Sequence, residues 1–135
     1  TKLCEGLKGS AVTSLNVDGH ALQIDELKGT KPTEKIDLSS KHLGVASAII
    51  IASCIKENGV LKELNLSFNR LGPQAGASLA EGLKGNTTLQ SLDLANNQLC
   101  GLSRLGWGTY TAEGVTKLCE GLKGSAVTSL NLEYN

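Results

Sequence analysis

The sequence predicts an α/β solenoid: a right-handed superhelix with about five short parallel strands on its concave face and helices on its convex face. A leucine-based motif recurs along the chain, and stretches with helical spacing of apolar residues separate its copies. One segment is also repeated without change, because residues 1–16 are identical to residues 116–131. Such internal repetition is typical of a fold in which similar units stack on one another.

The repeated core reads LxxLxLxxNxL. Its complete copies are Leu61, Leu64, Leu66, Asn69, Leu71 and Leu89, Leu92, Leu94, Asn97, Leu99, and a third copy contains Val127, Leu130, Leu132 and Asn135. Leucines that alternate with polar residues indicate a short strand with one buried face. Neighbouring copies are therefore expected to place their strands side by side.

Two looser copies precede these three. One contains Val12, Leu15, Val17 and Leu22, with His20 at the Asn position, and the other contains Ile36, Leu38 and Leu43, with Lys41 at that position. We expect both copies to add strands to the same parallel sheet.

The residues between the strands carry the signals of helices. In one unit Ala75, Leu79 and Leu83 recur at helical spacing and Gly85 follows them. We expect this glycine to end its helix in a left-handed conformation. The same role is predicted for its equivalents, Gly9, Gly29, Gly59 and Gly124.

The Asn of the motif is predicted to be structural. Where the chain leaves each strand, backbone groups are buried in a turn, and an amide side chain offers both donors and an acceptor to satisfy them. We expect Asn69, Asn97 and Asn135 to form a column of such side chains.

Composition excludes several classes of function. Thirteen basic residues balance thirteen acidic ones, so neither nucleic acid nor an anionic membrane is an expected partner. No apolar run approaches the roughly 20 residues that span a bilayer. The four cysteines are too sparse for a disulfide-stapled scaffold and form no CxxC pair for zinc. We therefore expect an intracellular, cytoplasmic protein, with an organelle such as a plastid as the alternative.

Three of the cysteines lie in apolar, helix-like stretches and are expected to be buried free thiols: Cys4, Cys54 and Cys119. No phosphate-binding loop, nucleophile elbow or metal-ligand spacing occurs in the sequence. No enzyme activity, metal or cofactor is therefore expected.

The segments LKELNLSFNRLG, LQSLDLANNQLC and EGLKGNTTL resemble leucine-rich repeat proteins, specifically the long-unit kind typified by ribonuclease inhibitor and the sensor domains of NOD-like receptors. This resemblance covers the whole chain apart from one insertion. It implies a single repeat domain over residues 1–135 that binds a protein partner through its concave face.

The candidate binding residues of that face are the exposed strand positions and the residues that flank them: Asp37, Lys62, Glu63, Asn65, Phe68, Asp93, Asn131 and Tyr134. The alternative is that the Asp and Asn residues merely follow the repeat consensus. A second candidate is an insertion at residues 100–110, which contains Arg104, Trp107 and Tyr110, residue types enriched at interface hot spots. Its alternative is that Trp107 folds back over an apolar edge.

The function predicted from these features is a protein-interaction module. The alternative is a permanent structural subunit that gives rigidity to a large multiprotein assembly. Since the end layers of a solenoid need a cover, we also expect further repeats or a neighbouring subunit to pack against both ends.

Overall fold

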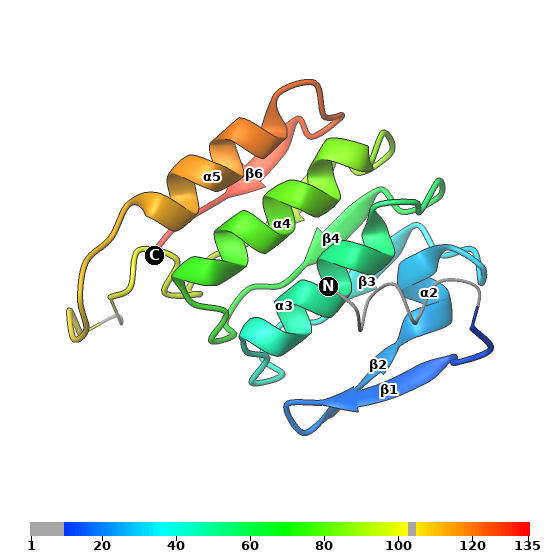
Figure 1. Ribbon diagram of the computed structural model, residues 1–135, viewed down its shortest axis with the longest axis horizontal. Helices are drawn as coiled ribbons and strands as arrows, with labels where there is room; N and C mark the ends of the chain where they lie inside the picture. The colour runs from blue at the N-terminus through cyan, green and yellow to red at the C-terminus, as the bar shows by residue number, and fades with distance from the viewer. Residues whose placement is uncertain (1–9, 103–104) are drawn as a thin grey trace.

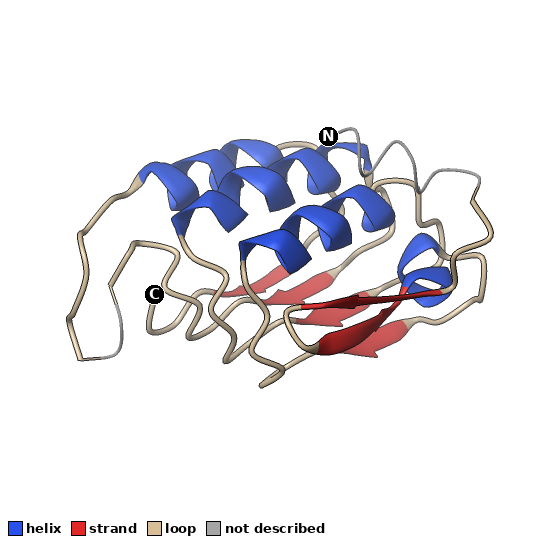
Figure 2. Ribbon diagram, turned by 60° about the horizontal axis from the view of Figure 1, so that its bottom comes forward, coloured by secondary structure: helices blue, strands red, loops and turns tan. Residues whose placement is uncertain are grey.

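The computed structural model describes residues 10–102 and 105–135, and it confirms the predicted fold class. Helices cover one face of a parallel sheet and leave the other face open (Figures 1 and 2). Among the described residues, no helix has the length and apolar character needed to cross a bilayer.

The parallel sheet is built from four of the predicted strands. They are β3 (Lys35–Asp37), β4 (Glu63–Asn65), β5 (Ser91–Asp93) and β6 (Ser129–Asn131). They lie in chain order, and Leu64 pairs with Leu92, which pairs with Leu130. Each strand thus repeats its neighbour's register, as the motif spacing predicts.

The helices that pack behind the sheet are α3 (Val45–Ile55), α4 (Pro73–Gly85) and α5 (Glu113–Leu122), and a short α2 (Ile24–Lys28) precedes them. Glycines set the spacing between these helices. A Cβ atom on Gly121 of α5 would lie 2.6 Å from the Cα of Ala80 in α4, and one on Gly82 would collide with the backbone of Ala52 in α3. Only glycine at these positions allows the helices to approach so closely.

The expected glycine caps are found in part. Gly29 and Gly124 are left-handed, with φ of 83° and 77°. The prediction is wrong for Gly59 and Gly85, whose φ angles are not positive. At Gly85 the reason for glycine is instead contact, because a Cβ atom would lie 2.6 Å from Cγ of Lys56. Gly9 lies outside the described residues.

The first looser copy of the motif does not form a parallel strand, so this prediction is wrong. Residues Ser14–Val17 (β1) pair in the antiparallel direction with His20–Gln23 (β2). The two residues between them, Asp18 and Gly19, have φ of 54° and 77°. Asp-Gly with two positive φ angles is the preferred two-residue hairpin turn, and it reverses the chain before the strand can join the sheet.

The tip of this hairpin caps a helix that lies far along the chain. Oδ2 of Asp18 accepts hydrogen bonds from the backbone N–H of Gly44 (2.9 Å) and from both the backbone N–H (3.3 Å) and the hydroxyl (2.6 Å) of Ser47. Gly44 and Ser47 form the first turn of α3, where backbone donors have no partner within the helix. These bonds lower the pKa of Asp18 below its ordinary value of 3.8, and the bond from the Ser47 hydroxyl has the largest effect.

The two ends of the stack differ. On the N-terminal side, Leu22 and Ile24 of the β1–β2–α2 unit are fully buried. On the C-terminal side, Leu130 and Leu132 are only half-buried, whereas their equivalents Leu92 and Leu94 are buried. The last layer of leucines therefore keeps apolar surface exposed to solvent.

We predict that Leu92→Ala lowers the free energy of unfolding by about 2–5 kcal/mol, because it opens a cavity between layers. Leu130→Ala is the matched control, and roughly half that loss or less is expected, since its side chain is already partly in water. Urea denaturation followed by circular dichroism measures both. A loss below about 1 kcal/mol for Leu92→Ala would contradict the stacked core.

We also predict that Asp18→Asn keeps the hairpin turn but removes a carboxylate from the N-terminus of α3, at a cost of about 0.5 kcal/mol. Because the folded-state pKa lies below the value of 3.8 for an unperturbed Asp, this contribution is complete at neutral pH. It disappears as the pH falls through the folded-state pKa. Urea melts of the wild type and the variant at pH 7 and pH 3 measure it, and an equal difference at both pH values would contradict the capping role.

Candidate protein-binding face

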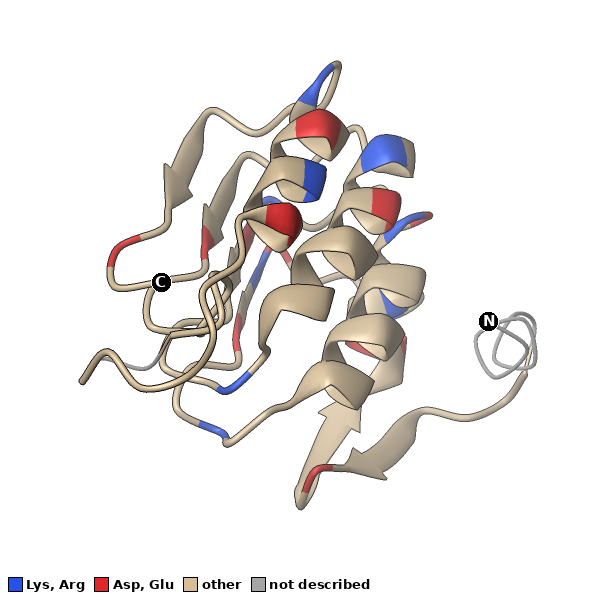
Figure 3. Ribbon diagram, turned by 60° about the vertical axis from the view of Figure 1, so that its left-hand side comes forward, with Lys and Arg blue, Asp and Glu red and all other residues tan. Residues whose placement is uncertain are grey.

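The open face of the sheet brings one row of predicted site residues together. Asp37, Asn65, Asp93 and Asn131 are the last residues of their strands, and the parallel register places them next to one another. Ion pairs flank this row, between Lys35 and Glu63 at 3.1 Å and between Lys62 and Glu34 at 3.7 Å. Charges of both signs are interspersed over the molecule (Figure 3).

Each residue of this row also has a structural role. The side chain of each accepts a hydrogen bond from the backbone N–H two residues later, at Ser39, Ser67, Ala95 and Glu133, with distances of 2.9–3.0 Å. This turn ends the strand and explains why Asp or Asn recurs there. At Asp37 the hydroxyl and the backbone N–H of Ser39 both donate, which lowers the pKa of its carboxyl.

The next feature of the open face is a shallow groove beside the strand ends. Its volume is about 220 Å³, and it is lined by His42, Phe68, Asn69, Arg70, Asn96, Gln98 and Tyr134. The exposed fractions of Phe68 and Tyr134 are 53% and 67%. Two aromatic side chains from different repeats therefore share one surface depression with polar neighbours.

The backbone at these two aromatic residues is unusual. Phe68 and Tyr134 both have φ of 57°, and they occupy the same repeat position as Ser40 and Asn96, which are left-handed too. The repeat demands this conformation, and Asn adopts it readily, whereas bulky residues avoid it. Phe68 and Tyr134 thus run against the backbone preference, and such conflicts concentrate at functional sites.

Behind the groove, buried Asn side chains connect the repeats. Oδ1 of Asn69 accepts from the backbone N–H groups of Lys41 and Leu43 in the preceding repeat, each at 3.0 Å. Its Nδ2 donates to the carbonyls of Leu38 and Leu66, in the preceding repeat and in its own. Asn69 therefore satisfies the turn of the repeat before it. That turn contains Lys41, which stands at the Asn position of its own repeat.

The other two Asn residues of the motif donate in the same way. Asn97 donates to the carbonyls of Leu66 and Leu94, and Asn135 donates to those of Leu94 and Leu132. Oδ1 of Asn97, however, has no hydrogen-bond partner among the described residues. The hydrogen bonds that Oδ1 of Asn97 lacks would come from the turn that contains Arg70. The φ of Arg70 is not positive, whereas the equivalent residues His42 and Gln98 are left-handed.

A family model described as leucine-rich repeat matches residues 58–80 and 85–99. Among solved structures, actin-binding site 2 of leiomodin-1 superposes with a TM-score of 0.68 at 19% identity, over 83% of this chain and 60% of that one. These two segments are thus leucine-rich repeats, and the fold of the described residues agrees with them. The chain spans about 60% of that structural neighbour, and none of the curated proteins matches it in sequence.

A second set of buried amides was missed by sequence reasoning. Asn58 and Asn86 follow α3 and α4, and each is at most 3% exposed. Asn86 donates to the carbonyls of Ile55 and Asn58, while its Oδ1 accepts from the N–H of Leu89. The signal was present in the sequence, because Asn58 directly precedes Gly59 and Asn86 directly follows Gly85 at the ends of these two helical stretches.

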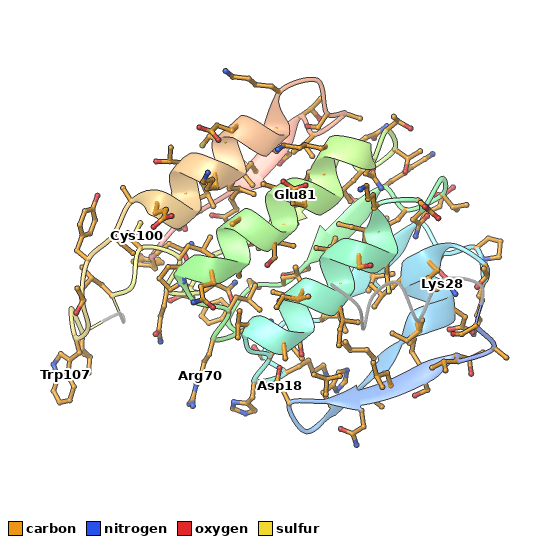
Figure 4. All side chains as sticks on the ribbon, in the orientation of Figure 1. Asp18, Lys28, Arg70, Glu81, Cys100 and Trp107 are labelled. Carbon is orange, nitrogen blue, oxygen red and sulfur yellow. The ribbon has the colours of Figure 1, made fainter. Side chains whose placement is uncertain are left out.

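The predicted insertion projects between β5 and α5. Trp107 and Tyr110 are exposed, with exposed fractions of 76% and 65%, and the Trp107 side chain projects away from the sheet and helices (Figure 4). A single antiparallel bridge between Leu102 and Gly108 closes it. The exposure of Trp107 does not fit the alternative in which it covers an apolar edge. Arg104 lies outside the described residues.

The cysteines fit the expectation only in part. Cys54 is buried within α3, as expected, but Cys119 is exposed on α5, so that prediction is wrong. Cys119 occupies the place on α5 that Ala80 occupies on α4. Gly121 of α5 packs against Ala80, whereas no helix in the described part of the chain packs against Cys119. Cys4 lies outside the described residues. Within the described ranges, no cluster of His, Cys, Asp and Glu is suited to hold a metal ion.

We predict that Trp107→Ala changes the free energy of unfolding by less than about 0.5 kcal/mol, because the side chain is mostly in water. Thermal denaturation of the wild type and the variant measures this difference. A large fall in melting temperature would show that Trp107 packs against the solenoid in solution.

Proposed function

We propose that this leucine-rich repeat protein is a protein-interaction module without catalytic activity, and that it binds its partner through the open strand face. The observation that carries the proposal is the groove between Phe68 and Tyr134. Exposed aromatic rings in a depression are the side chains that most often dominate a protein interface. The structural neighbour is titled an actin-binding site, which supports a protein as the class of partner.

The polar row beside the groove would position the partner rather than anchor it. Each residue of this row already uses one side-chain oxygen in the turn that ends its strand, so a partner can bond only to the remaining polar atoms of Asp37, Asn65, Asp93 and Asn131. The ion pairs of Lys62 and Glu63 lie at the rim and contribute little binding energy. Phe68 and Tyr134 are the expected anchors.

The insertion is a second contact region under this proposal. Trp107 and Tyr110 are exposed side chains of the type found at interface hot spots. Arg104 belongs to the same segment in the sequence. The interval of 28 residues between the paired Leu64 and Leu92 supports the long-unit, ribonuclease-inhibitor-like kind of repeat. The balanced charge of the chain supports a protein rather than a nucleic acid as partner, and four scattered cysteines, with no disulfide between those that the structure describes, support an intracellular, cytoplasmic location.

A second candidate function is a fixed structural role in a larger assembly. The half-buried layer of Leu130 and Leu132, together with exposed Cys119, favours it because another repeat or subunit packed there would bury all three. Under this hypothesis another subunit of the assembly would cover the open strand face permanently. Subunit exchange separates the two functions, since a recruited partner dissociates and a permanent one does not.

We predict that Phe68→Asn weakens partner binding at least about tenfold, as expected for the loss of an anchoring ring. The same change leaves the free energy of unfolding equal or raises it by up to about 1 kcal/mol, because Asn tolerates the left-handed conformation. The measurement combines urea melts with quantitative mass spectrometry of proteins captured by the tagged wild type and variants.

Lys117→Ala on the exposed side of α5 is the matched control and should capture the same proteins as the wild type. Equal capture by wild type and Phe68→Asn would contradict the groove as the anchor. A loss of stability in Phe68→Asn would show that Phe68 serves packing.

A further inference from the structure

A second groove lies at the opposite end of the sheet, between the hairpin and the first parallel strand. Its volume is about 340 Å³, and its walls are β2, which contributes Ala21 and Gln23, and β3, which contributes Lys35 and Asp37. Leu27, Ile36 and Leu38 also line it, so its base is apolar. It shares no lining residue with the groove between Phe68 and Tyr134.

The wall formed by β3 is a free sheet edge. Glu34 accepts from the N–H of Lys62, and Leu38 donates to the carbonyl of Asn65, so alternate residues of this strand bond to β4. The parallel pattern therefore turns the N–H and C=O groups of Lys35 and Asp37 away from β4 and toward the groove. Among the described residues, β3 has no strand on this side.

The opposite wall is also a free edge. Ile24 donates to the carbonyl of Thr13 at 2.9 Å, which identifies that pair as a hydrogen-bonded pair of the hairpin. In an antiparallel ladder such pairs alternate, so Ala21 and Gln23 belong to the other kind. Ala21 therefore turns its N–H and C=O groups outward, and Gln23 turns its N–H outward, whereas the carbonyl of Gln23, the N-cap residue of α2, belongs to the first turn of that helix. In the described part of the chain, β2 pairs with β1 alone.

Two free edges thus face one groove, and along both strands buried side chains alternate with exposed ones. Leu22 and Ile36 point into the core, while Ala21, Lys35 and Asp37 are exposed. A strand placed between them would find backbone donors and acceptors on both sides. Its side chains would alternate between the apolar base and the polar open face.

We propose that this groove, which we call the edge slot, binds an extended segment of a partner protein by adding it as a strand between β2 and β3. The chemistry of the segment follows from the walls: polar and apolar residues alternate, and no large net charge is required, because Lys35 is already paired with Glu63 and Glu26 with Lys31. This site is separate from the groove at Phe68, and either can exist without the other.

A proline at position 35 tests the edge slot with little disturbance of the sheet. Lys35→Pro removes an outward N–H but spares the bonds of Glu34 and Leu38 to β4, and proline is tolerated on edge strands. Lys35→Ala is the matched control, because it also loses the ion pair with Glu63 but keeps the N–H. Ala21→Pro makes the same change on the opposite wall, and urea melts establish that each variant remains folded.

The probe is a library of random linear peptides displayed on phage and selected on the wild-type chain. We expect selected peptides to bind Lys35→Ala as they bind the wild type. They should bind Lys35→Pro and Ala21→Pro at least about tenfold more weakly, because a buried carbonyl of the peptide then loses its backbone N–H donor. Hydrogen exchange of the amides of Ala21, Gln23, Lys35 and Asp37 should slow when peptide is bound, and Phe68→Asn should bind the peptides normally.

Four results would overturn the proposal. One is a selection that enriches no peptide on the wild type over the Lys35→Pro variant. Another is bound peptide that leaves the four amides in fast exchange. The third is a dimer of the chain alone in which these amides are already protected, since the slot would then hold a second copy. Loss of binding through Phe68→Asn alone would point to the other groove.

Discussion

Each repeat of this protein depends on the next one to bury its leucines and to satisfy its turn. The side chain of Asn69 shows the constraint most clearly, because it bonds to the backbone of two successive repeats at once. A buried turn with unpaired amides would lose about 1–3 kcal/mol per group. The strands therefore have to lie in register, and the open face, the groove at Phe68 and the row of strand-end residues follow from that register.

The same constraint explains where the molecule departs from regularity. Stacking requires left-handed residues beside the Asn column, and Ser40 and Asn96 meet this demand easily while Phe68 and Tyr134 do not. At Arg70 the backbone leaves the pattern, and Oδ1 of Asn97 lacks a partner among the described residues. These irregularities border one groove, which is why we assign binding there rather than to the regular row of Asp and Asn residues.

Both ends of the stack also carry consequences. On the C-terminal side, half-buried Leu130 and exposed Cys119 mark a layer that another unit could complete. On the N-terminal side, the hairpin covers the core, and its Asp18 caps α3, but it leaves the edge of β3 unpaired. Within the described residues, β3 therefore keeps a free edge beside the hairpin, and such edges are prone to pairing with another chain.

The sequence by itself determined the four parallel strands, the helices behind them and the Asn residues between repeats, because period-2 leucines in successive copies of one motif leave few other ways to bury apolar side chains. It also contained Asp18-Gly19, whose turn preference outweighs the resemblance of Ser14–Val17 to a parallel strand. Only the tertiary structure decided which candidate residues share a surface. The groove at Phe68 and the edge slot join residues from different repeats, and their shape depends on backbone angles and on unpaired edges that no local pattern encodes.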